Sequence, residues 1–169
     1  AIFSANLKYR YVLRRTAGLG ANGRLLVVLL NPSTADSVRN DPTVTRCIRF
    51  ARDWGYSQLS VCNLFAYRAT KPKEMKRVDD PVGPDNDQWL KYEAGHSDFI
   101  MAGWGDHGRW KGRSEQVMAL LAPFGPVHCW DVNASGEPTH PLYKALETQP
   151  SRYVIGIEID GHLEGAPVP

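Results

Sequence analysis

The sequence has no long hydrophobic run, and this absence sets the first limit on what the protein is. The longest unbroken apolar stretch covers residues 25–30, whereas a helix that crosses a bilayer needs about 20 apolar residues. The chain also does not open with a charged segment followed by an apolar one, so no secretory signal is predicted. We therefore expect no membrane partner.

Cysteine is scarce. Only Cys47, Cys62 and Cys129 are present, and each lies far from the others in apolar surroundings. An odd number of widely spaced cysteines does not fit a disulfide framework, a zinc site or an iron–sulfur site. The pattern predicts reduced core thiols in a cytoplasmic protein, with no bound metal.

An excess of charge of one sign is lacking as well. The formal net charge is only +2, so overall electrostatics do not identify a nucleic-acid-binding protein. Basic residues do gather in two local clusters, formed by Arg46, Arg49 and Arg52 and by Lys71, Lys73, Lys76 and Arg77. A solvated surface with nearby acids is the commoner explanation of such clusters, so charge alone leaves DNA binding open.

Several catalytic motifs are absent: the G-x-S-x-G nucleophile elbow, the G-x-x-x-x-G-K-[ST] phosphate loop and the H-E-x-x-H zinc motif. The segment Gly18-Leu19-Gly20 precedes the first buried strand instead of following it. That context does not fit a dinucleotide-binding fingerprint, and no cofactor is predicted.

What is present predicts one α/β domain over residues 1–169, and we expect it to be monomeric. The 43% apolar content is that of a globular protein. Residues 24–30 form a continuous aliphatic run, typical of a strand buried on both faces. Helix signals are clearest after it, where Asp41 can cap a helix, Pro42 suits its first position and Gly55 can end it.

Four strand-then-helix units follow one another along the chain. Strands are predicted at 24–30, 59–64, 99–102 and 127–132, and helices at 41–55, 85–95, 114–121 and 141–146. An N-terminal strand or hairpin within 1–23 and a C-terminal edge strand or tail over 150–169 complete the pattern. This order predicts a doubly wound, mostly parallel sheet with ligands bound beyond the carboxyl ends of its strands.

Polar residues that could carry chemistry stand at those strand ends. Asn31 directly follows the buried strand, and Pro32 stiffens the loop that continues through Ser33 to Asp36. Such residues can orient a water or a substrate, although turns and helix caps use the same residue types.

Asn63 ends the second strand inside an apolar run, where an unsatisfied amide is costly. An amide offers both a donor and an acceptor, which suits the edge of a nucleobase. A structural asparagine is the open alternative. Phe65 and Arg68 follow it and could stack on or hold a planar ligand.

His140 lies between a proline-bearing loop and Pro141. A histidine fixed in this way can donate a hydrogen bond to a developing anion, although a lone histidine is often structural. His107, beside Asp106 in a glycine-rich loop, is a weaker candidate.

With these residues located, the chain resembles a bacterial and phage family labelled as a domain of unknown function, number 1643. The resemblance runs from Arg10-Tyr11 to about Tyr143. It depends on the segments N-P-S-T-A-D at 31–36, D-P-T at 41–43, N-L-F-A-Y-R at 63–68, W-G at 104–105 and H-P-L-Y at 140–143.

A more distant resemblance is to the uracil-DNA glycosylase superfamily. It implies a three-layer α/β/α fold with a central, mostly parallel four-stranded sheet. The segment Leu29-Leu30-Asn31-Pro32-Ser33 is similar to the first motif of its mismatch-specific branch, and His140-Pro141-Leu142 is similar to its later histidine-proline motif.

The resemblance also implies roles. Asn31 would position the attacking water, Asn63 would read the base, and His140 would stabilise the departing base anion. Leu142 and Tyr143 would wedge into the duplex. Substrate-binding roles fall to the residues around them, namely Pro32, Ser33, Phe65, Arg68 and Trp104.

Asp36 and Asp41 add carboxylates near the first motif, and we include Asp36 among the predicted catalytic residues. The leading hypothesis is therefore a DNA glycosylase-like enzyme that hydrolyses the N-glycosidic bond of a flipped, damaged or modified base. Two alternatives remain: an N-glycosyl hydrolase or transferase acting on a free nucleotide or nucleoside, and a non-catalytic reader of modified DNA bases.

Overall fold

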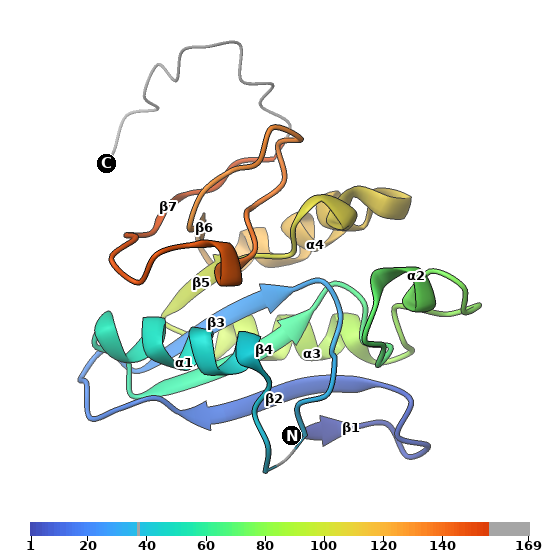
Figure 1. The fold of residues 1–169 in the computed structure, drawn as a ribbon, viewed down its shortest axis with the longest axis horizontal. Helices are drawn as coiled ribbons and strands as arrows, with labels where there is room; N and C mark the ends of the chain where they lie inside the picture. The colour runs from blue at the N-terminus through green and yellow to red at the C-terminus, as the bar shows by residue number, and fades with distance from the viewer. Residues whose placement is uncertain (37, 156–169) are drawn as a thin grey trace.

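The computed structural model describes residues 1–36 and 38–155, and within them seven strands form one sheet (Figure 1). The strand order is β1-β2-β4-β3-β5-β6-β7. The strands are β1 (Ile2–Phe3), β2 (Arg10–Thr16), β3 (Arg24–Leu29), β4 (Gln58–Asn63), β5 (Phe99–Ala102), β6 (Val127–Cys129) and β7 (Ser151–Arg152). The helices among these residues are α1 (Pro42–Asp53), α2 (Pro72–Met75), α3 (Asn86–Gly95) and α4 (Arg113–Leu121).

The mixed α/β class is confirmed, and the four predicted parallel strands lie side by side as β4-β3-β5-β6. The predicted strand number is wrong, because β1, β2 and β7 extend the sheet by antiparallel pairing. Antiparallel neighbours need no crossover helix, so they leave no strand-then-helix signal. The predicted C-terminal edge strand or tail includes β7, while residues 156–169 lie outside the described part of the chain.

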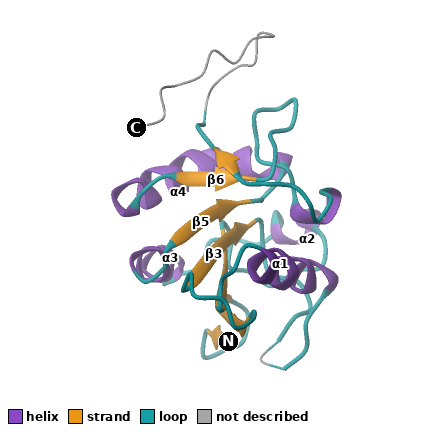
Figure 2. Ribbon diagram, turned by 90° about the vertical axis from the view of Figure 1, so that its left-hand side faces the viewer, coloured by secondary structure: helices purple, strands orange, loops and turns teal. Residues whose placement is uncertain are grey.

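The aliphatic run of β3 explains its central place. Leu26 and Val28 pack into one hydrophobic cluster, and Leu25, Val27 and Leu29 pack into another on the opposite face of the sheet. The first cluster includes buried residues of α3 and α4, and the second includes buried residues of α1. Figure 2 shows α1 on one side of the strands and α3 and α4 on the other.

Helix α1 begins and ends where the sequence predicts. The Asp41 carboxylate accepts a hydrogen bond from the Val44 amide at 2.8 Å, and Pro42 occupies the first helical position. Gly55, which follows the helix, adopts a positive φ of 81°, a conformation that glycine adopts without steric cost.

The last predicted helix, 141–146, is wrong. Residues Pro141–Tyr143 form a single 3-10 turn, and the chain is extended again at Lys144. The Lys144 carbonyl accepts a hydrogen bond from the Arg46 guanidinium of α1. This tertiary contact fixes the chain outside a helix, which local propensity cannot anticipate.

The last predicted strand is shorter than expected, ending at Cys129 instead of Val132. The Asp131 side chain accepts a hydrogen bond from the Val132 amide. The short helix α2 forms within a segment that the sequence predicts as a loop.

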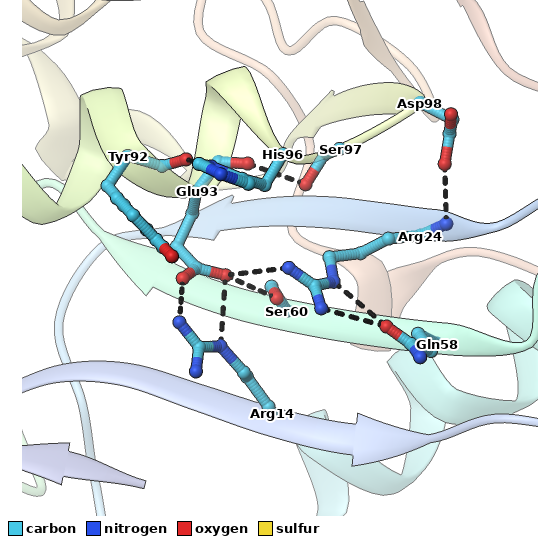
Figure 3. A network of polar contacts seen from close by, with 9 residues as sticks. All are labelled: Arg14, Arg24, Gln58, Ser60, Tyr92, Glu93, His96, Ser97 and Asp98. Atoms are coloured by element: carbon cyan, nitrogen blue, oxygen red, sulfur yellow. Dashed lines mark hydrogen bonds and ion pairs between the residues drawn. The ribbon is translucent and has the colours of Figure 1, made fainter.

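A buried ion-pair network joins α3 to three strands (Figure 3). Glu93 is fully buried and receives hydrogen bonds from Arg14 and from Ser60, the latter at 2.6 Å, while Arg24 lies 3.8 Å away. Burial alone would raise the pKa of Glu93, but these hydrogen bonds and positive charges outweigh burial and hold the pKa below its usual value. The network therefore ties α3 to the sheet through a charged carboxylate.

The chain order creates a cleft at the carboxyl end of the parallel strands. From β3 the chain crosses by α1 to β4 on one side, and then returns by α3 to β5 on the other side of β3. The loops that leave β3 and β5 therefore part in opposite directions. Ligands of open α/β sheets bind at such a reversal of strand order.

Candidate functional site

A cavity of about 540 Å³ lies beyond the carboxyl ends of the parallel strands. Its wall takes residues from the loops that follow all four of these strands. The volume falls within the range of small-molecule pockets. Among the residues singled out in the sequence, the cavity is lined by Asn31, Ser33, Asp41, Asn63, Trp104, His107, His140, Leu142 and Tyr143.

Other predicted site residues do not line this cavity. They are Pro32, Asp36, Phe65 and Arg68. The Asp36 carboxylate accepts hydrogen bonds from the amides of Arg39 and Val38, and these bonds lower its pKa. Phe65 is fully buried in the core against Trp110, with ring centroids 5.4 Å apart. The contacts of Asp36 and Phe65 are therefore those of structural residues.

Arg68 points to a different surface. Its guanidinium donates a hydrogen bond to the Leu7 carbonyl at 3.1 Å and lies 5.0 Å from the ring centroid of Phe3. The residue lines a separate, shallower hollow with Tyr67 and Thr70. Arg68 thus fastens the N-terminal segment to the loop after β4.

Asn63 lines the cavity with a buried side chain. It is the last residue of β4 and is 1% exposed, yet neither amide atom has a hydrogen-bond partner among the described residues. Its backbone is held firmly, because the Asn86 side chain donates to its carbonyl at 3.0 Å. The result is a rigidly placed donor and acceptor in the cavity wall.

Asn31 is oriented by two hydrogen bonds. Its amide nitrogen donates to the Ala69 carbonyl at 2.8 Å and to the Pro32 carbonyl at 3.1 Å. These bonds settle which end of the amide is nitrogen. Within the described chain no hydrogen bond uses the side-chain oxygen, which is left as an acceptor.

Burial favours the neutral form of the His140 ring, and a hydrogen bond defines the position of its proton. Burial lowers its pKa, and the nearby Asp41 charge counteracts this only in part. Its Nδ1 accepts a hydrogen bond from the Leu142 amide at 3.3 Å. A neutral ring that accepts at Nδ1 carries its proton on Nε2, so Nε2–H is a donor.

Trp104 closes one wall and is fixed from behind. Its indole N–H donates to the buried Glu137 carboxylate at 2.6 Å, and Ser114 donates to the other oxygen at 3.1 Å. Gly108 packs so closely that a Cβ atom there would lie 2.1 Å from the indole ring. The indole therefore has little freedom to turn.

Three charged residues also line the cavity, namely Arg10, Asp41 and Asp106. Arg10 is only 2% exposed, and burial lowers its pKa to about 10. Its guanidinium donates to the Ala35 carbonyl at 2.5 Å, which holds the loop after β3. Asp41 lines the cavity while it caps α1.

Residues 10–142 match the family described as Protein of unknown function (DUF1643). The chain belongs to this family. The match covers the parallel strands and every predicted residue of the cavity except Tyr143. No curated protein and no solved structure matches the chain.

Among residues 1–36 and 38–155, no group of three or more histidine, cysteine, aspartate or glutamate residues is placed to hold a metal ion. No helix in the same part of the chain is both long and apolar enough to span a membrane. The three cysteines are free and buried.

Sequence reasoning did not select four polar residues of the cavity: Arg10, Thr43, Thr70 and Asn133. Arg10 opens β2, so its side chain reaches the cavity only through pairing with a strand nearly 50 residues away. Asn133 directly follows the predicted strand 127–132, and its bonds to Thr139 and Asp106 show that it braces the loop there. Position after a strand was the available signal for Asn133, and no local signal marked Arg10.

Proposed function

We propose that this protein binds a nucleobase flipped out of DNA and hydrolyses its N-glycosidic bond, with a fold and site related to those of the uracil-DNA glycosylase superfamily. The observation that carries the proposal is the unpartnered amide of Asn63. An unsatisfied buried polar group costs about 1–3 kcal/mol, and such a group calls for an explanation. A nucleobase edge, with its own donors and acceptors, supplies the missing partners.

In the proposed reaction, Asn63 reads the base while Asn31 and His140 act on the bond. The side-chain oxygen of Asn31 accepts a hydrogen bond from a water and directs it at C1′ of the sugar. The C1′–N bond breaks first, its electron pair leaves with the base, and the sugar becomes oxocarbenium-like. The water then bonds to C1′ and releases a proton, and the base anion takes up a proton, so the products are free base and abasic sugar.

His140 would stabilise the base anion. Its Nε2–H is the available donor for this hydrogen bond. A donor held in place before reaction stabilises developing charge strongly. Asn31 is no base, so this site would depend on a good leaving group.

Two exposed apolar residues support DNA as the source of the base. Leu142 is 43% exposed and Tyr143 is 82% exposed, and both border the cavity. Large apolar side chains at a cavity mouth are typical of interaction sites. In the proposed complex they fill the space that the extruded base leaves in the stack.

A second candidate is an N-glycosyl hydrolase for free nucleotides. Asp41 and Arg10 favour it, because they bring opposite charges into the cavity wall. Asp41 is tied to the Val44 amide through one oxygen, which weakens its claim to act on the sugar. We therefore prefer the hypothesis that the substrate is DNA.

The test is release of free base from single-stranded and duplex oligonucleotides. The panel carries uracil, hypoxanthine, xanthine, and hydroxymethylated or glucosylated pyrimidines, and the corresponding free nucleotides form a second arm. Asn31→Ala, Asn63→Ala and His140→Ala are compared with His96→Ala. His96 is the matched control because it is exposed at the end of α3 and does not line the cavity.

Release of one base that the three cavity variants abolish and His96→Ala preserves supports the proposal and names the substrate. Release from free nucleotides alone selects the second candidate. Tight binding of a modified oligonucleotide without release identifies a reader of modified bases. If the folded protein shows no binding and no release, the proposal is refuted.

A further inference from the structure

A second hollow, which we call the basic groove, adjoins the mouth of the cavity. Its volume is about 530 Å³. The residues that line it are Lys71, Pro72, Lys73, Lys76, Arg77 and His107. Four of these six side chains carry a permanent positive charge, and none of the six is acidic.

The charges of the basic groove are not neutralised by neighbouring acids. Glu74, Asp79 and Asp80 belong to the same segment but do not line the groove. Across residues 1–36 and 38–155, none of the four cations is in an ion pair. Unpaired cations gathered in a concave surface attract a polyanion.

The segment that presents these cations is well anchored. Met75 of α2 is fully buried in the core, and the Lys76 amide donates to the Pro72 carbonyl at 3.0 Å. The Lys76 ammonium lies 3.0 Å from Nδ1 of His107 and 5.5 Å from the ring centroid of Trp110. The cations thus sit on a fixed turn instead of a free loop.

The basic groove is continuous with the cavity, because Pro72 and His107 line both. A polymer with one unit in the cavity can therefore place its neighbouring units over the groove. We propose that the basic groove binds the phosphodiester backbone of DNA beside the nucleotide held in the cavity. This inference rests on the proposed function, since it takes DNA as the ligand.

The experiment measures binding of a short unmodified oligonucleotide by fluorescence anisotropy between about 50 and 200 mM salt. Lys73→Gln/Arg77→Gln is the test variant, because both side chains are exposed and neither is in an ion pair within the described part of the chain. Arg49→Gln/Lys91→Gln is the control with the same loss of charge. Arg49 and Lys91 are also exposed, and neither lines the cavity or the basic groove.

Each phosphate contact contributes about 0.7 to the slope of log affinity against log salt for single strands and about 0.9 for duplexes. The test variant should therefore reduce the magnitude of this negative slope, by about 1.4 for single strands and about 1.8 for duplexes. The control variant should leave the slope unchanged. An unchanged slope in the test variant, an equal loss in the control, or no DNA binding would overturn the inference. Equal competition by polyglutamate would assign the groove to acidic proteins and overturn it too.

This result is separable from the proposed function. A smaller slope without base release supports the groove and counts against the glycosylase reaction. Base release together with an unchanged slope in the test variant supports the reaction and shows that the groove does not bind DNA.

Discussion

Two asparagines at the end of β4 offer a stability test of the central argument. Asn63 and Asn86 are 1% and 0% exposed and lie next to each other. The Asn86 side chain donates to the carbonyls of Asn63 and Leu64 at 3.0 and 3.1 Å. The Asn63 side chain has no hydrogen-bond partner in the described part of the chain. Truncation to alanine should therefore affect the two positions very differently.

The expected magnitudes follow from the hydrogen bonds that are lost. Asn86→Ala removes two neutral hydrogen bonds, each worth about 1 kcal/mol, and leaves the Asn63 carbonyl without that donor. Leu64 keeps the hydrogen bond from Arg113 at 2.8 Å. We expect a loss of about 2–3 kcal/mol in the free energy of unfolding, and a fall of about 4–12 °C in Tm for a chain of this length. Asn63→Ala loses no hydrogen bond, so its cost should stay below about 1 kcal/mol.

Thermal unfolding followed by circular dichroism, with urea unfolding as a second method, measures both variants. Base binding should show the reverse order, with Asn63→Ala the more damaged variant. If Asn63→Ala loses as much stability as Asn86→Ala, the amide is bonded within the folded protein. The reasoning that links it to a nucleobase would then be refuted.

Three further predictions concern separate parts of the molecule. The ring of His140 should titrate below pH 6.5 in an NMR titration, because burial lowers its pKa. The stability that the neutral ring provides is present above pH 6.5 and is lost on acidification. A titration midpoint above 6.5 would contradict this prediction. Glu93→Gln should cost about 1.5–3 kcal/mol at neutral pH. Because the folded pKa of Glu93 is lowered, the difference from wild type should shrink as the pH falls through that pKa, and a constant difference in acid unfolding curves would rule out the ion pair with Arg14 as its source. Leu142→Ala and Tyr143→Ala should reduce base release from duplex DNA but not from single strands, with unfolding free energies within about 0.5 kcal/mol of wild type; equal losses on both substrates would remove the wedge role.

The centre of the fold follows from the sequence because its signals are local. The aliphatic run of β3 and the cap at Asp41 depend only on neighbouring residues, and both lie where expected. The antiparallel strands β1, β2 and β7 were not counted in the sheet, because their place depends on pairing partners. Two of them are only two residues long, too short for any periodicity to appear.

The site was predictable to the same extent. Asn31, Asn63 and His140 follow parallel strands, and strand ends of one sheet meet at one edge, so their proximity could be anticipated. Phe65 does not line the cavity, because β4 ends at Asn63 and the chain then turns into the core. Past that point strand alternation no longer tells which way a side chain points.

The origin of the cavity wall also bears on how the protein acquires its activity. Each of the four parallel strands supplies one part of the wall, so residues more than 100 positions apart must come together. No single strand and its following loop supply the whole wall, and the long-range pairings that complete it are costly in loop entropy. Binding competence should therefore appear only with the last step of folding and vanish with the first loss of the sheet, which makes ligand binding a direct reporter of native structure in this protein.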